Sequence, residues 1–208
     1  MATKSNCKLY ICVLYIIIFF LHLTYLYISN ILILYYDIST YYKTDAQELL
    51  MRQLTELKKN PNDSFSVGLG DDGNLFRWEI MIMGPADSLF EGGFFKAEMT
   101  FPPDFPNSPP TLKFLSKMWH PNIYPDGKVC ISILHAPGED KFNTQESAEE
   151  RWRPILGVES VLVSVLSMLC DPNIESPANI DAAKQLRDEP KEFKRAVRRV
   201  VRQSADDM

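Results

Sequence analysis

The chain has 208 residues, 46% of them hydrophobic, which is enough for one globular domain with a full core and a further segment. Its formal net charge is −5, so there is no excess of Lys and Arg to neutralise a phosphate backbone. We therefore expect no nucleic acid among its partners.

Residues 1–43 differ in composition from the rest of the chain. From Leu9 to Tyr36 the sequence is almost wholly apolar and aromatic and contains no charged residue. A helix of this length exceeds the roughly 30 Å hydrocarbon core of a bilayer, and a cleaved signal peptide would have a shorter apolar run. Two interpretations stay open: a tilted transmembrane helix, which makes a membrane a partner, and a gene-model extension translated from AT-rich non-coding sequence.

Residues 44–208 have the composition of a soluble domain. Thr44-Asp45-Ala46-Gln47 matches a capping box, and Leu50, Leu54 and Leu57 follow at helical spacing. The pattern predicts a helix that begins at this box and ends at Asn60-Pro61.

Four strands follow in the predicted order, and their apolar residues alternate. In the second strand Trp78, Ile80 and Ile82 alternate, and in the third Phe95, Ala97 and Met99 do so. Prolines between residues 102 and 110 exclude a helix or central strand there and predict an ordered turn. The predicted strands are Phe65–Leu69, Leu75–Met83, Phe94–Phe101 and Thr111–Phe114.

A loop is expected from Trp119 to Leu134, because Pro and Gly residues punctuate it. Helical spacing returns at Val158 to Leu169 and at Lys191 to Gln203. One helix, four strands and then helices predict an α+β fold, with an antiparallel meander and helices gathered on the sheet.

Four cysteines are present, without the pattern of a disulfide framework, which favours a reducing compartment. Cys130, in the predicted loop, has Val129, Ile131 and Ile133 around it, and such a cysteine is usually a small buried hydrophobe. Cys170 at the end of an apolar helical stripe is interpreted in the same way. A thiolate is also the side chain that both attacks an activated carbonyl and leaves again. No motif for a metal site is present.

His120-Pro121-Asn122, followed eight residues later by Cys130, resembles the active-site signature of ubiquitin-conjugating enzymes. The resemblance covers about residues 44 to 205, including Ile82-Met83-Gly84-Pro85, Phe90-Glu91-Gly92-Gly93, Trp152-Arg153-Pro154 and Asp171-Pro172-Asn173. The segment His135 to Asp140 is similar to the subgroup with a long acidic loop, which is associated with endoplasmic-reticulum-linked degradation. That subgroup has no amino-terminal membrane segment, so residues 1–43 depart from it.

The resemblance implies a ubiquitin-conjugating fold in which Cys130 accepts ubiquitin from the activating enzyme as a thioester. Ubiquitin would then pass to a substrate lysine with a RING-type ubiquitin ligase, building chains for proteasomal degradation. ATP is used by the upstream enzyme, so no cofactor is expected. The implied compartment is the cytosol, or the cytosolic face of the endoplasmic reticulum membrane.

The resemblance also assigns supporting roles at the site. Asn122 would donate to the oxyanion, worth about 2.7 to 4 kcal/mol, and its alternative role is to brace the loop. His120 would be a buttress rather than a base. Ser176 occupies the family's gate position and would help the lysine lose its proton as the site closes.

An acidic run follows the active site and includes Glu139, Asp140, Glu146, Glu149 and Glu150. Such carboxylates would attract a lysine ammonium but would also raise its pKa, so they would position the amine rather than activate it. A solvated surface loop is the alternative interpretation for several of them.

Partner surfaces are implied by the same resemblance. Phe114, Pro154 and Ile155 would grip a ubiquitin ligase, and Arg52 with Lys58 and Lys59 would contact the activating enzyme. A core Phe, a turn Pro and a solvated helix face are the alternatives. Other functions considered are a silent ubiquitin-binding relative, a cysteine hydrolase using Cys130 and His120, and a membrane scaffold.

Overall fold

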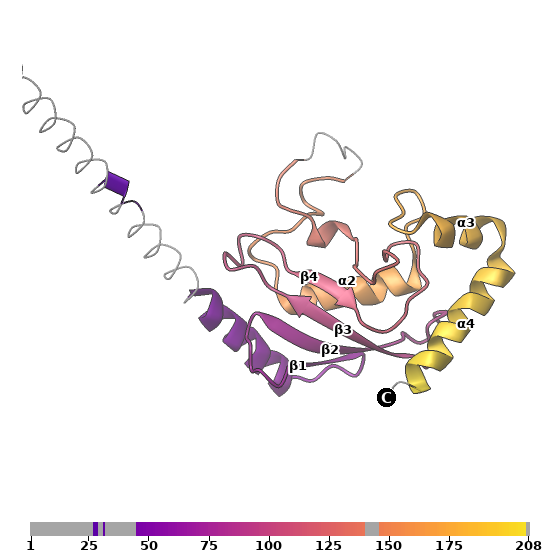
Figure 1. Ribbon diagram of the computed structural model, residues 1–208, viewed down its shortest axis with the longest axis horizontal. Coiled ribbons are helices and arrows are strands. Elements are labelled where there is room, and N and C mark those ends of the chain that lie inside the picture. Colours follow the sequence, from indigo (N-terminus) through magenta and orange to yellow (C-terminus); the bar gives the residue numbers. More distant parts are fainter. Residues whose placement is uncertain (1–26, 29–30, 32–44, 140–145, 207–208) are drawn as a thin grey trace, which may run out of the picture. The chain divides into compact units, whose positions relative to one another are not determined.

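The computed structural model describes residues 27–28, 31, 45–139 and 146–206. Four antiparallel strands form one sheet in sequence order, namely β1 (Phe65–Leu69), β2 (Arg77–Met83), β3 (Phe94–Thr100) and β4 (Thr111–Phe114). Helices cover residues 45–59, the short 3-10 helix η1 (Ser132–Leu134), α2 (Val158–Cys170), α3 (Ile180–Asp188) and α4 (Pro190–Asp206). The predicted α+β class with a meander sheet is confirmed (Figure 1).

One face of the sheet forms the core. Trp78, Ile80 and Ile82 of β2 are at most 3% exposed, and Ile82 pairs with Phe95 of β3. The alternation therefore arises from the two-residue period of a strand. β2 begins two residues later than predicted, because the side chain of Asn74 accepts a hydrogen bond from the Phe76 N–H at 3.0 Å and forms a turn there.

Two helices lie next to each other at one end of the sheet in Figure 1, and one of them was not predicted. α4 buries Phe193, Val197 and Val200 as the spacing predicts, and it contacts β3. α3 is the unpredicted helix. The side chain of Asn179 caps it by accepting a hydrogen bond from the Ala182 N–H at 3.1 Å.

Backbone hydrogen bonds hold the loop between β4 and η1. The Tyr124 N–H donates to the Lys128 carbonyl at 2.8 Å. Gly127 has a φ of 93°, and a Cβ there would lie 2.2 Å from the Phe114 carbonyl oxygen, so the turn requires glycine. The predicted loop is confirmed except for its last three residues, which form η1. This loop carries Cys130.

The apolar segment from Leu9 to Tyr36 lies outside the described residues except for 27–28 and 31, and Thr44 also lies outside them. Its two interpretations therefore stay predictions. Within the described part of the chain, no helix combines the length and the apolar character needed to cross a membrane.

Candidate functional site

The thiol of Cys130 opens onto a small cavity. Cys130 is only partly buried and lines a cavity of about 170 Å³ together with Tyr124, Lys128, Leu134 and His135. A wholly buried hydrophobe would have no such access, so that interpretation of Cys130 is wrong. Cys170 is exposed at the end of α2, which also corrects its interpretation as a buried residue. It does not line this cavity.

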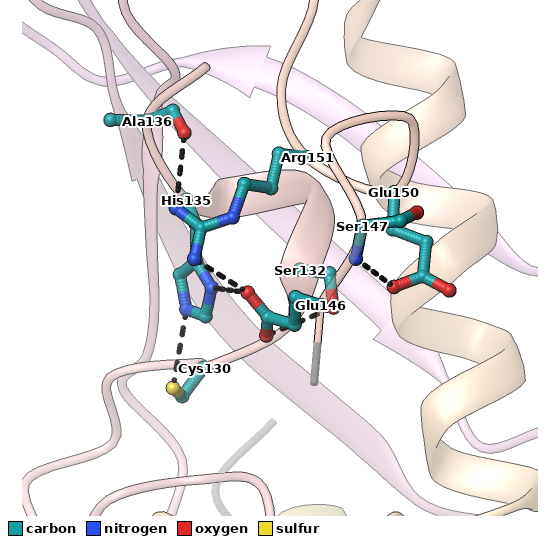
Figure 2. Close-up of polar contacts among 8 residues, drawn as sticks. All are labelled: Cys130, Ser132, His135, Ala136, Glu146, Ser147, Glu150 and Arg151. Atoms are coloured by element: carbon teal, nitrogen blue, oxygen red, sulfur yellow. Dashed lines mark hydrogen bonds and ion pairs between the residues drawn. The ribbon is translucent and has the colours of Figure 1, made fainter. Parts of the chain in front are cut away.

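A chain of polar contacts begins at this thiol (Figure 2). The Sγ atom of Cys130 lies 3.5 Å from Nε2 of His135, and Nδ1 of the same ring lies 2.8 Å from Oε2 of Glu146. Nη2 of Arg151 lies 3.2 Å from the same oxygen, and the Ser132 hydroxyl donates to the other at 3.1 Å. The result is a cysteine, a histidine and a carboxylate in series, with a guanidinium behind them.

The electrostatics of this chain favour a charged thiolate. The hydrogen bond from His135 lowers the pKa of Cys130, against the opposing effect of burial, and a hydrogen bond from Tyr124 lowers it further. The pKa of His135 is raised to about 9, first by its hydrogen bond to Cys130 and then, against burial, by Glu146. Both directions favour a thiolate paired with an imidazolium.

Asn122 is clamped beside the nucleophile. Its Nδ2 donates to the Asn173 carbonyl at 2.8 Å, and its Oδ1 accepts from the Asn173 N–H at 2.9 Å. Its own carbonyl accepts from the Cys130 N–H at 3.0 Å. The amide is 3% exposed, so Asn122 ties the loop of Cys130 to the segment that follows α2.

His120 lies in the interior and does not contact the thiol. It is 0% exposed, its Nδ1 accepts from the Asn122 N–H at 3.0 Å, and its Nε2 lies 3.0 Å from the Met168 carbonyl. Burial lowers its pKa to about 4. His120 therefore holds Asn122 as a neutral ring. The alternative of a hydrolase that pairs Cys130 with His120 loses its geometric basis.

Among the described residues, those that line the Cys130 cavity do not include the predicted supporting residues Ser176 and Glu139. Ser176 is exposed in the segment between α2 and α3, and Glu139 is exposed as well. Asp140 lies outside the described residues. Glu146, from the same acidic run, is instead turned toward His135 and Arg151, so this carboxylate is not part of a solvated loop.

The predicted partner residues divide into exposed and buried ones. Ile155 is 87% exposed, and its neighbour Pro154 and the helical Arg52 are exposed too. Phe114 is 2% exposed and packs edge-on against Phe95, so the structure places it in the core rather than on a ligase-binding surface. The next residue, Leu115, is 60% exposed.

The sequence did not single out His135 or Arg151 as site residues. His135 follows Cys130 by five positions with η1 between them, and a 3-10 turn of this length brings the ring back toward the thiol. A histidine shortly after a candidate nucleophile and a carboxylate within a dozen residues were the available signal. Within the described residues, no three His, Cys, Asp or Glu side chains are grouped as a metal site.

Comparison with known proteins identifies relatives across the described domain. The family model of the ubiquitin-conjugating enzyme matches residues 49–201. Ubiquitin-conjugating enzyme E2 15 of Schizosaccharomyces pombe is 56% identical over 161 residues, which are 77% of this chain and 96% of that protein. Ubiquitin-conjugating enzyme E2 G2 of Homo sapiens is 48% identical over 159 residues, 76% of this chain and 96% of that protein. The structure of human ubiquitin-conjugating enzyme E2 G1 has a TM-score of 0.54 at 54% identity and covers 61% of this chain and 96% of its own.

Proposed function

Because this chain belongs to the ubiquitin-conjugating enzyme family, whose members transfer ubiquitin through a thioester, we propose that Cys130 is the residue that carries ubiquitin. One observation carries the proposal. The Cys130 thiol opens onto a cavity and contacts His135, whereas Cys170 lies elsewhere at the end of α2. An accessible thiol beside a basic ring is what a nucleophilic cysteine requires.

The reaction has two acyl transfers. The Cys130 sulfur attacks the carboxyl-terminal carbonyl of ubiquitin, and the thiol of the activating enzyme leaves. A lysine amine of the substrate then attacks the new thioester, and Cys130 leaves. Asn122 supports the second step, because an amide nitrogen carries two hydrogens and Asn173 accepts one of them. Within the described contacts the other hydrogen is left for the oxyanion.

A charging assay tests the assignment of Cys130. The full chain, incubated with activating enzyme, ATP and ubiquitin, is expected to form an adduct that a thiol reagent cleaves. Cys130→Ala is expected to form none, and Cys170→Ala is expected to charge at the unchanged rate. An adduct that survives in Cys130→Ala would assign the thioester to another residue. Turnover of ubiquitin esters without activating enzyme would favour a hydrolase.

The finer function follows from the acidic-loop resemblance of residues 135 to 140. We extend the proposal to polyubiquitin chain building for proteasomal degradation, with a RING-type ligase, in the cytosol or at the cytosolic face of the endoplasmic reticulum membrane. Relatives that match over nearly their whole length support an intact conjugating domain. Fractionation of cells expressing the full chain, followed by a carbonate wash, tests the membrane part of this proposal.

The exposed Ile155 is expected to contact the ligase. Ile155→Ala is expected to lower ligase-stimulated transfer by about tenfold, because the few side chains that anchor an interface each contribute more than about 1 kcal/mol, and Ile155 is 87% exposed and free to serve as such an anchor. Charging by the activating enzyme should not change. Val163→Ala, which removes a 46% exposed side chain from α2, is the matched control. An equal loss in both variants, or a loss in charging, would contradict a ligase contact at Ile155.

A further inference from the structure

His135 faces the sulfur that carries ubiquitin, and it does so in an orientation fixed from three sides. Its N–H donates to the Ser132 carbonyl at 2.9 Å, and its carbonyl accepts from the Trp152 N–H at 3.2 Å. Its Nδ1 lies 2.8 Å from Glu146. With the backbone and Nδ1 held in this way, Nε2 points at Sγ of Cys130 (Figure 2).

The carboxylate that holds the ring is itself anchored in the protein. Oε2 of Glu146 lies 3.2 Å from Nη2 of Arg151, and Oε1 accepts a hydrogen bond from the Ser132 hydroxyl at 3.1 Å. The Arg151 side chain is only 6% exposed, and its Nη1 donates to the Ala136 carbonyl at 3.4 Å. The base beside the thiol is therefore held by Glu146, which the buried Arg151 anchors, whereas His120 is engaged with the backbone of Asn122 and Met168.

We propose that His135 is a further catalytic residue of the ubiquitin transfer, with Glu146 and Arg151 as the residues that position it. This rests on the proposed function of Cys130. When ubiquitin is accepted, Nε2 of His135 holds the proton of the Cys130 thiol while the sulfur attacks, and the departing thiolate of the activating enzyme takes that proton from Nε2, which leaves the ring neutral. When ubiquitin is passed on, Nε2 takes the proton lost by the amine, and Cys130 leaves as the thiolate of the restored ion pair.

The charged groups around the pair set its pH response. Tyr124 and Lys128 face the cavity from the loop, and Glu146 with Arg151 lies behind the ring. Glu146 raises the pKa of both partners, which opposes the thiolate and favours the imidazolium. The hydrogen bond from His135 is the largest influence on the thiol and lowers its pKa.

Alkylation of Cys130 by iodoacetamide measures the thiolate directly and needs no activating enzyme. On the full chain, labelling of the Cys130 peptide is followed by mass spectrometry as a function of pH. In His135→Gln the midpoint of labelling is expected to rise by at least about one pH unit toward the usual thiol value near 8.5. Labelling at pH 7 should then fall by about tenfold or more.

Glu146→Gln tests the positioning residue without changing the size of its side chain. A smaller rise in the midpoint is expected, because the ring loses the carboxylate that orients and charges it, while the loss of a negative charge that raises the thiol pKa offsets part of this effect. The exposed Glu149→Gln is the matched control and should leave the midpoint unchanged. The Cys170 peptide serves as the internal standard in each sample. Tryptophan fluorescence shows that each variant is folded.

The transfer step gives a second measurement. Single-turnover discharge from Cys130 to free lysine is expected to become more steeply dependent on pH in His135→Gln than in the wild type. An unchanged alkylation midpoint in a folded His135→Gln protein would overturn the role of His135 even if Cys130 carries ubiquitin. Charging that persists in Cys130→Ala would instead overturn the proposed function, so the two failures are separate.

Discussion

Replacing Asn122 by Ala is expected to slow discharge of ubiquitin to lysine by about 100- to 1000-fold, while Cys130 is still charged. The reason is geometric. The backbone carbonyl of Asn122 accepts from the Cys130 N–H, and the side-chain nitrogen of Asn122 carries a hydrogen beyond the one that Asn173 accepts. As a donor to the oxyanion, that hydrogen would stabilise the negative charge of the tetrahedral intermediate.

Bracing of the loop is the competing explanation, because the same substitution also removes both hydrogen bonds to Asn173. Single-turnover rates of charging and discharge, measured on the full chain, separate the two. A donor to the oxyanion of aminolysis predicts that discharge falls far more than charging. Bracing alone predicts that both fall together as the nucleophile is misplaced.

Asn179→Ala supplies the matched control. Asn179 is also a buried asparagine, and its backbone N–H donates to the Pro121 carbonyl of the same loop at 2.8 Å, but its side chain caps α3. Its loss is expected to cost about 1 kcal/mol of stability and to change discharge by less than about threefold. A comparable discharge defect in both variants would refute the oxyanion role of Asn122.

His120 is expected to make the fold less stable as the pH falls from 7 to 5. The pKa of this ring is lowered to about 4 by burial, whereas an unfolded histidine titrates near 6.5. Protonation would also put an N–H on Nδ1 facing the Asn122 N–H, where a lone pair now accepts. The folded state therefore resists a proton that the unfolded state takes up.

The sign of the effect follows from that difference. Because the pKa of His120 is lower in the folded state than in the unfolded state, the contribution of this ring to the stability of the fold is fully present above about pH 6.5. It is lost as the pH falls toward about 4. Between pH 7 and pH 5 the loss amounts to about 2 kcal/mol in the free energy of unfolding.

Urea unfolding followed by the fluorescence of the tryptophans measures this contribution in the wild type and in His120→Gln. The variant is expected to be less stable at pH 7, because Gln does not reproduce both ring contacts. The difference in the free energy of unfolding between the wild type and His120→Gln should be smaller by about 2 kcal/mol at pH 5 than at pH 7. A gap that stays constant over this range would show that His120 takes up its proton equally in both states.

The strands could be predicted because their signal is local. Trp78, Ile80 and Ile82 alternate in the sequence with the period that the sheet imposes. α3 could not be predicted in this way, because it buries only the two small side chains of Ala182 and Ala183, which give no apolar stripe. Its sequence signal was the cap at Asn179 and the proline that follows its end.

The site residues also differ in whether a local sequence signal could predict them. Cys130 and Asn122 were identified from a motif, but the contacts of His135 and Glu146 depend on how η1 and the following segment turn back, which no periodic pattern records. Phe114 was assigned to a partner surface because a resemblance carries residue types without their exposure. In the structure Phe114 is buried as the last residue of β4, and Leu115, the first residue beyond the strand, is exposed.

The contacts of Cys130 and the contacts of Asn122 differ in how far apart in the sequence the contacting residues lie. Cys130 and His135 are separated by 5 positions and His135 and Glu146 by 11, whereas Asn122 and the Asn173 backbone are separated by 51. Partial openings of a native protein release contiguous units before the whole structure unfolds. An opening that frees the segment after α2 would keep the thiol with its base and lose the clamp on Asn122. In that opened state Cys130 could still accept ubiquitin but would transfer it to lysine slowly. Acceptance and transfer of ubiquitin would therefore be lost at different free energies of local unfolding.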